Sequence, residues 1–140
     1  MTAGERSGPN VAFYTCFVML GLYISSYQNM ADAIATEYQM GLSLMGTIVA
    51  MHFVGSVIAP PAMGRLADAR GARMAVLGSL GLIVVGLLAV VLLKSRVAAA
   101  GGILIVGCGF AAIEGLMTSA LAALNPGREE RVINRSQMWF

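Results

Sequence analysis

The sequence predicts an all-α membrane protein with four transmembrane helices. Its 140 residues are 58% hydrophobic and only 11% charged, whereas soluble chains carry about a quarter of charged residues. Fifteen of the sixteen charged residues fall in five short clusters. The stretches between these clusters are long enough for the roughly 20 residues that a helix needs to cross a bilayer. The clusters are 5–6, 32–37, 65–73, 94–96 and 128–135.

The charge clusters and polar segments set the expected boundaries. Residues 1–10 are polar and form a predicted cytoplasmic tail, and residues 125–140 a cytoplasmic loop followed by the start of a fifth helix. The apolar segment between them, 11–124, forms the predicted four-helix bundle. Its helices are expected at about 11–36, 43–63, 74–93 and 97–124.

The last three residues, Met138-Trp139-Phe140, turn apolar after a polar segment. An aromatic pair on a rising hydrophobic trend is typical of the interfacial start of a membrane helix. We therefore expect the chain to be the N-terminal part of a longer protein.

The distribution of basic residues predicts the orientation. Seven arginines lie on the side that holds both ends of the chain and the 65–73 cluster, and only Lys94 and Arg96 lie on the other side. Basic residues are enriched in cytoplasmic loops. Both ends are therefore expected in the cytoplasm of a protein of the cell (inner) membrane.

Composition and motifs argue against several other classes. A net charge of +2 without a basic patch gives no reason to expect a nucleic-acid partner. The two cysteines, Cys16 and Cys108, lie in different apolar spans and predict neither a disulfide framework nor a metal site. The sequence shows no phosphate-binding glycine loop and no nucleophile–base pair. We expect no enzyme activity and no cofactor.

The segment 64–73 is expected to be a short loop between two antiparallel helices. Gly64 and Gly71 would allow tight turns, and Asp68 stands among three arginines, where it can accept charge-assisted hydrogen bonds. From composition alone, a solvated loop that follows the positive-inside rule is the favoured interpretation of the segment.

This segment resembles the signature loop of the major facilitator superfamily, Gly-x-Leu-Ala-Asp-Arg-x-Gly-Arg-Arg. Six positions match, whereas Ala69 and Ala72 replace basic residues of the pattern. The resemblance implies the first four helices of a twelve-helix transporter fold, and a conformational gate formed by the loop. The matching residues are Gly64, Leu66, Ala67, Asp68, Gly71 and Arg73.

The loop after the fourth helix, from Asn125-Pro126 to Asn134, resembles the segment before the fifth helix of these transporters. Arg131 in this loop is the expected partner of Asp68. A glycine-rich fourth helix that carries Glu114 is also similar to the fucose-permease-like branch, although Thr118 stands where that branch has Asn, and Gln28 where it has an acid.

Glu114 is the only acidic residue inside the last three predicted spans. Ionisable groups in a membrane usually face a cavity or a partner, and a carboxyl that exchanges protons there suits a proton-coupled carrier. Thr118, one helical turn further on, is its polar companion. The alternative is a structural hydrogen bond to another helix.

Other polar residues in the spans are weaker candidates for the substrate or proton pathway. Tyr27, Gln28 and Asn29 belong to a polar band of the first helix. This band either lines a solute path, or makes hydrogen bonds between helices where the first helix leaves the membrane. His52, central in the second helix, is either a packed neutral residue or a proton relay.

The sequence thus predicts a secondary transporter that moves a small solute together with protons by alternating access. The chain would contribute one wall of the cavity, and its expected partners are the solute, protons, the lipid bilayer and the missing C-terminal helices. Two alternatives stay open. One is a small four-helix exporter that acts as a homodimer, and the other is a non-transporting membrane interaction protein or a truncated product.

Overall fold

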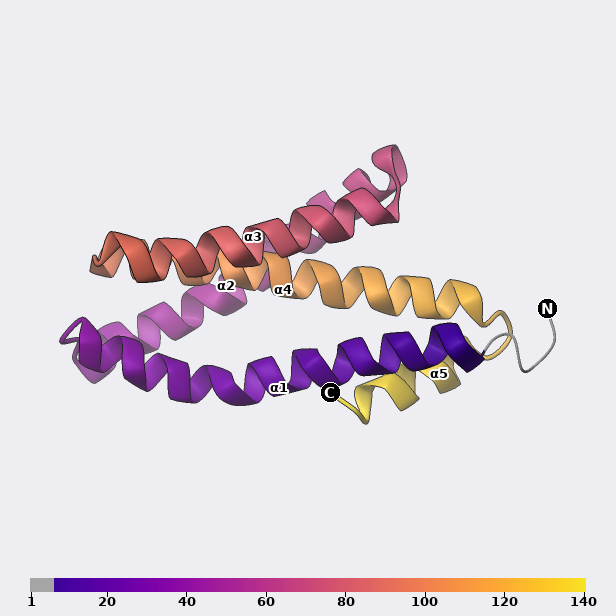
Figure 1. The fold of residues 1–140 in the computed structure, drawn as a ribbon, viewed down its shortest axis with the longest axis horizontal. Helices are drawn as coiled ribbons and strands as arrows, with labels where there is room; N and C mark the ends of the chain where they lie inside the picture. The colour runs from indigo at the N-terminus through magenta and orange to yellow at the C-terminus, as the bar shows by residue number, and fades with distance from the viewer. Residues whose placement is uncertain (1–6) are drawn as a thin grey trace. The chain divides into compact units, whose positions relative to one another are not determined.

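The structure, a computed structural model, describes the backbone of residues 7–140 and the side chains from Asn10 onward, Gln28 excepted. This part of the chain forms helices and no strand (Figure 1). Four of the helices are long and apolar enough to cross a membrane. The predicted all-α class with four membrane spans is therefore confirmed. The helices are α1 (Ser7–Glu37), α2 (Leu42–Arg70), α3 (Ala72–Leu93), α4 (Arg96–Leu124) and α5 (Glu129–Gln137).

Helix α2 continues to Arg70, seven residues past its expected end at residue 63, so the predicted loop is almost entirely helical. Pro60 and Pro61 lie inside the helix without ending it. The residues that follow Gly64 are mostly Arg, Leu and Ala, which are strong helix formers. Their preference for helix outweighs the polarity that suggested a loop.

The turn between α2 and α3 consists of Gly71 alone. Its backbone has φ 88°, a conformation that side chains disfavour and glycine adopts freely. The Gly71 amide donates to the carbonyl of Ala67 at 2.8 Å, and the Met74 amide donates to the carbonyl of Gly71 at 3.1 Å. The chain reverses direction here within one residue.

The chain divides into two compact units. The central unit comprises residues 28–116, that is, the end of α1, all of α2 and α3, and most of α4. The terminal unit comprises the chain up to Tyr27 and from Met117 onward, including α5.

Glycines bring the helices of the central unit into close contact. A Cβ atom added at Gly102 of α4 would lie 2.6 Å from the carbonyl oxygen of Gly86 in α3. A Cβ atom at Gly55 of α2 would lie 2.8 Å from the amide nitrogen of Cys108 in α4. Helix α4 therefore meets the backbones of both α2 and α3. Small residues at such interfaces let dispersion forces hold helices together in lipid, where the hydrophobic drive is missing.

The end of the central unit that holds the α3–α4 turn is tied by hydrogen bonds. Arg96 donates to the carbonyl oxygens of Tyr38 and Gln39 at 3.2 and 3.0 Å. The Tyr38 hydroxyl donates to the carbonyl of Val90 near the end of α3. These bonds join the α1–α2 connection to the α3–α4 hairpin.

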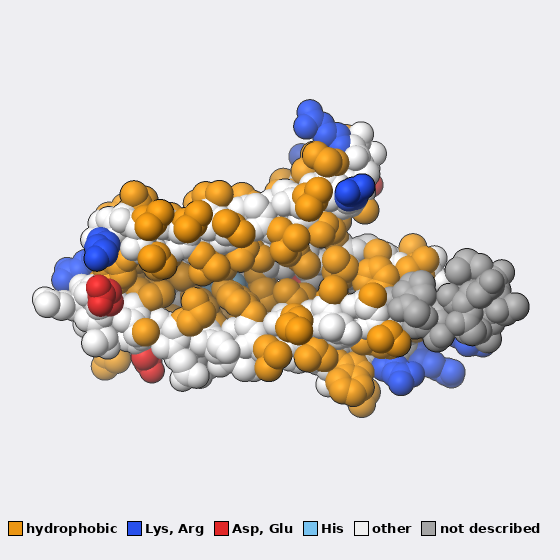
Figure 2. All heavy atoms as spheres, in the orientation of Figure 1, with side chains coloured by type: hydrophobic (Ala, Val, Ile, Leu, Met, Phe, Trp, Pro, Cys, Tyr) orange, Lys and Arg blue, Asp and Glu red, His pale blue; other side chains and the backbone are white. Residues whose placement is uncertain are grey.

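Helix α3 presents apolar side chains outward over most of its length, and Figure 2 shows them on the surface of the central unit. Its 22 residues span about 33 Å at 1.5 Å per residue, close to the ~30 Å hydrocarbon core of a bilayer. Basic residues flank the helix at both ends: Arg70 and Arg73 at one, Lys94 and Arg96 at the other. The exposed apolar residues include Leu80, Val84, Val85, Leu88, Val91 and Leu92.

The terminal unit has a small core of its own. Phe17 of α1, Leu121 of α4 and Val132 of α5 are buried together. Asn10 and Asn125 donate to each other's side-chain oxygens at 3.1 and 3.0 Å, which joins α1 to the end of α4. These contacts hold α5 beside the first half of α1 (Figure 1).

Helix α5 begins with Glu129, earlier than the predicted fifth helix, and ends at Gln137, before the apolar residues that suggested one. The Glu129 carboxylate accepts a hydrogen bond from the Gly127 amide at 2.8 Å. Hydrogen bonds from the backbone amides of Glu129 and Gly127 hold the pKa of the Glu129 carboxyl below its ordinary value. The ionised carboxylate also suits the positive N-terminus of the helix.

The contact between α3 and α4 gives a first prediction. Replacing Gly102→Ala places a methyl group 2.6 Å from the Gly86 carbonyl oxygen and 2.7 Å from a Val90 methyl group, so the helices must separate. We expect this overpacking to lower stability by about 1–3 kcal/mol. Thermal unfolding in detergent, followed by the reaction of the half-buried Cys16 and Cys108 with a thiol-reactive dye, measures the change.

The matched control is the neighbouring Gly101→Ala. A Cβ atom at Gly101 would meet nothing within 4 Å, so this variant should be neutral or slightly more stable, since Ala is the better helix former. Equal transition temperatures for the two variants would contradict the close contact.

Candidate functional site

Helix α4 carries Glu114 and Thr118, two of the candidate residues for the substrate or proton pathway. Both side chains are half-buried, and residues four apart on a helix lie on the same face. Two residues closer to the start of the helix share this face. Phe110 lies one turn before Glu114, and Gly107 lies two turns before it. This face of α4 therefore carries the Glu114 carboxyl, the Thr118 hydroxyl and Gly107, where another helix approaches closely.

His52 of α2 faces this part of α4. A Cβ atom at Gly107 would lie 2.8 Å from the carbonyl carbon of His52, so the two backbones touch at this point. The His52 side chain is only 1% exposed, and the centre of its ring lies 5.5 Å from that of Phe110. Glu114 lies seven residues beyond Gly107, or about 10 Å along the helix axis.

Aromatic rings pack against His52 on two sides. Phe53 also lies beside it, with ring centres 5.7 Å apart and nearly perpendicular planes. Edge-to-face pairs of this kind stabilise aromatic packing. Sequence reasoning missed Gly107 and Phe110 as neighbours of His52, because their contact joins two helices and no local pattern records it.

The polar band of α1 separates into residues with different exposure. Tyr27 is buried, at 4% exposure, whereas Asn29 is exposed. Only the backbone of Gln28 is described, so its side chain lies outside the described part of the structure. Tyr23 stacks at a tilt on Tyr27, with ring centres 6.2 Å apart. Tyr23 was missed by the sequence analysis, although its spacing of four residues from Tyr27 is the signal of a shared helix face.

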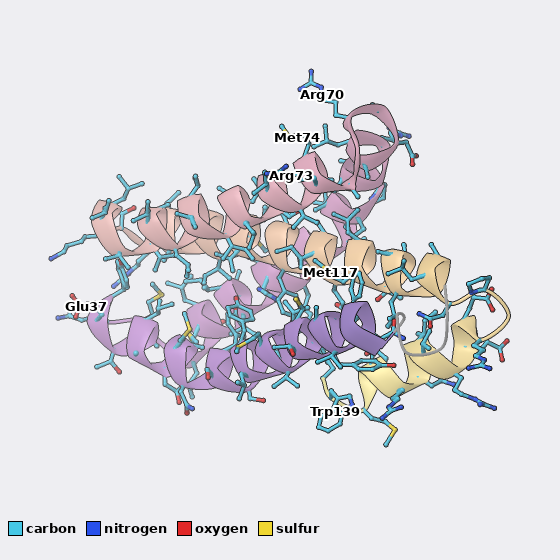
Figure 3. All side chains as sticks on the ribbon, turned by 45° about the vertical axis from the view of Figure 1, so that its right-hand side comes forward. Glu37, Arg70, Arg73, Met74, Met117 and Trp139 are labelled. Atoms are coloured by element: carbon cyan, nitrogen blue, oxygen red, sulfur yellow. The ribbon has the colours of Figure 1, made fainter. Side chains whose placement is uncertain are left out.

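The predicted gate residues lie at the corner between α2 and α3. Asp68 belongs to the last turn of α2 and is exposed, and Arg73 is exposed in the first turn of α3. Gly64 is half-buried inside α2, and Gly71 makes the turn. Figure 3 shows Arg70 pointing outward from this corner. The gate motif is therefore a helix end with a sharp turn and an open charged surface.

Arg131, the expected partner of Asp68, is exposed on α5. The two residues belong to different compact units, and their pairing stays a prediction. In the described residues, His, Cys, Asp and Glu side chains do not gather in groups of three that could hold a metal ion.

The family comparison agrees with the helical architecture. The sequence matches the family model described as Major Facilitator Superfamily over residues 11–138. No curated protein and no solved structure matches it significantly. The family match spans all four candidate membrane helices and α5. The chain belongs to the major facilitator superfamily, whose members are membrane transporters of small solutes and not enzymes.

Proposed function

We propose that the chain forms part of a secondary transporter that moves a small solute by alternating access, coupled to protons. The match to the superfamily over residues 11–138 is the observation that carries this proposal. Such carriers alternate by rocking helical bundles around a site near the middle of the membrane. The half-buried Glu114 and the charged α2–α3 corner supply candidates for the two required functions, coupling and gating.

The proposed location is the cell (inner) membrane, with both ends of the chain in the cytoplasm. The three arginines of the α2–α3 corner and the two basic residues of the α3–α4 hairpin flank α3, which is long enough to separate the two membrane surfaces. Together with the arginines of the terminal segments, the larger group supports the assignment of this side to the cytoplasm.

The four spans form, in this proposal, one wall of a larger bundle. The superfamily fold has two six-helix halves, so we expect the native product to contain about eight further helices. The intact mass of the protein purified from native membranes checks this. A mass equal to that of the 140 residues would instead favour a homodimeric exporter or a non-transporting membrane protein.

Glu114 is the proposed proton site. Its half-buried position, in a segment of more than twenty otherwise uncharged residues, is costly for a carboxylate and favours a functional role. Thr118 on the same face can hydrogen-bond a hydroxylated solute. Tyr27, Gln28, Asn29 and His52 complete the proposed pathway. Sugars are the favoured solute class, in line with the resemblance to the fucose-permease-like branch.

Replacing Glu114→Gln should uncouple solute movement from protons. Gln keeps the size and the hydrogen bonds of the side chain but cannot titrate. Proteoliposomes that contain a pH-sensitive dye are tested with a panel of sugars. In the wild type, the transported sugar should acidify the lumen, and uptake should increase as the external pH falls. In the variant, the acidification and pH dependence should disappear while exchange of labelled sugar for unlabelled sugar continues.

The matched control is Glu130→Gln, which removes an exposed carboxylate from α5. It should leave acidification and exchange unchanged. If Glu114→Gln kept the wild-type pH dependence, Glu114 would instead have the structural role of a hydrogen-bonding group between helices.

Asp68 is the proposed gate residue, together with Gly64, Gly71, Arg73 and Arg131. A carboxylate in the last turn of a helix faces the negative end of the helix dipole, which disfavours it by roughly 0.3–1 kcal/mol. Asp68 occupies this position and is exposed. Its position in α2 therefore does not benefit the helix, which supports a role in binding another part of the transporter in one conformation.

Replacing Asp68→Asn should open the cytoplasmic side more often. A single cysteine placed at the exposed Ala69, with Cys16 and Cys108 changed to Ser, reports access to the corner. A membrane-impermeant maleimide on the cytoplasmic side should label it faster in the Asp68→Asn background. Solute affinity should stay within a few-fold of the wild-type value.

The control is Asp32→Asn, which removes an exposed acid from α1 and should leave the labelling rate unchanged. An unaltered rate in the Asp68 variant, or loss of solute binding by a folded protein, would contradict the gating role.

A further inference from the structure

A groove lies between the first half of α1 and the end of the chain in the terminal unit. Its volume is about 400 Å³, within the roughly 300–1,000 Å³ of ligand sites. One stripe of α1 forms one side, and Trp139, labelled in Figure 3, forms part of the other. The residues that line it are Val11, Tyr14, Thr15, Val18, Arg135 and Trp139.

The lining combines a mainly apolar slot with a single cation. Val11 is 61% exposed and Trp139 54% exposed, so the apolar wall is open and unfilled by other side chains. Arg135 is the one charged residue of this lining. Its guanidinium carbon lies 5.5 Å from the centre of the Tyr14 ring, a cation–π distance that holds the charge at the groove.

A second hollow, of about 760 Å³, adjoins the groove and shares Arg135 and Trp139 with it. Arg131 adds a second cation to this hollow, while Glu130 adds one acid. The remaining polar group there is the Asn134 amide. The junction of the two hollows thus offers two guanidinium groups to an anion, with apolar surface running away along α1.

The depth of the groove in the membrane matches that of lipid headgroups. The apolar stretch of α1 begins at Val11, directly after the polar residues 1–10, so Val11 to Val18 form the first two turns of this apolar stretch. Trp, Tyr and Arg are typical of this interfacial zone. A molecule in the groove would therefore have its charged end at the surface and its apolar part in the hydrocarbon.

We propose that this groove binds an anionic phospholipid. The phosphate lies at Arg135, with Arg131 beside it, and an acyl chain follows the slot between Val11, Val18 and Trp139. A soluble anion would contact only the cation, whereas a phospholipid contacts the cation with its phosphate and fills the apolar slot with an acyl chain. The lining of the groove contains none of the residues of the proposed solute and proton pathway, whereas Arg131 is shared with the proposed gate. The assignment of the groove to the cytoplasmic leaflet rests on the proposed orientation.

Trp139 is the only tryptophan among the 140 residues and reports directly on the groove. The whole native protein, with any tryptophan outside these residues changed to Phe, is placed in phosphatidylcholine vesicles. Brominated phosphatidylglycerol or brominated phosphatidylcholine is then added at equal mole fraction. Bromine quenches tryptophan on contact, so the ratio of the two quenching constants measures the preference for the anionic lipid.

We expect phosphatidylglycerol to be preferred about fivefold, since one basic residue near a lipid surface contributes roughly this factor. Arg135→Gln should remove the preference, and Arg135→Lys should keep most of it. The matched control Arg128→Gln removes the same charge from a residue that does not line the groove and should keep the preference.

Equal quenching by the two lipids in the wild type would overturn the proposal. The same holds if Arg128→Gln and Arg135→Gln reduced the preference equally, because the effect would then arise from overall charge. Inorganic phosphate in excess over the lipid should leave the preference intact. If phosphate abolished it, the site would be one for a soluble anion and the assignment to a lipid would be wrong.

Discussion

Close backbone contact along α4 is the constraint on which the central unit depends. Lipid tails are as apolar as the side chains, so moving an apolar side chain from lipid into a helix contact releases little free energy. Helices in lipid therefore associate through dispersion forces, which need short distances between the helix axes. Gly102 meets the α3 backbone, and Gly107 meets the α2 backbone at His52. Because both neighbouring helices approach so closely, a larger residue cannot replace glycine at these two positions of α4 without moving a helix. Glu114 belongs to this tightly held helix.

The same constraint bears on the proposed role of Glu114. A proton site needs a fixed position. A carboxyl that moved freely could exchange protons with water in every conformation of the transporter. Close glycine contacts fix α4 on two sides, whereas Glu114 itself is only half-buried. A group that exchanges protons during a conformational cycle needs both a rigid backbone and a side chain that water can partly reach.

The sequence predicted the spans well because hydropathy and charge clustering depend on each segment alone. The bounds of α3 and α4 differ from the expected ones by one or two residues. The end of α2 was missed, because a polar helix end and a polar loop have the same composition. Contacts such as Gly107 with His52, or Arg135 with Tyr14, join residues that are far apart in the sequence. A single sequence carries no local signal for them.

The same limit applies to the last residues of the chain. Trp139 and Phe140 follow α5, which ends two residues before Trp139, and the start of a further membrane helix at these residues stays a prediction. A Cβ atom at Gly21 of α1 would lie 3.0 Å from the carbonyl carbon of Phe140, so this apolar end folds against α1. Aromatic residues at a membrane interface thus serve to anchor and to pack as well as to begin a span. In the terminal unit, Phe140 packs on α1 at Gly21, and Trp139 and Arg135 line the groove beside it.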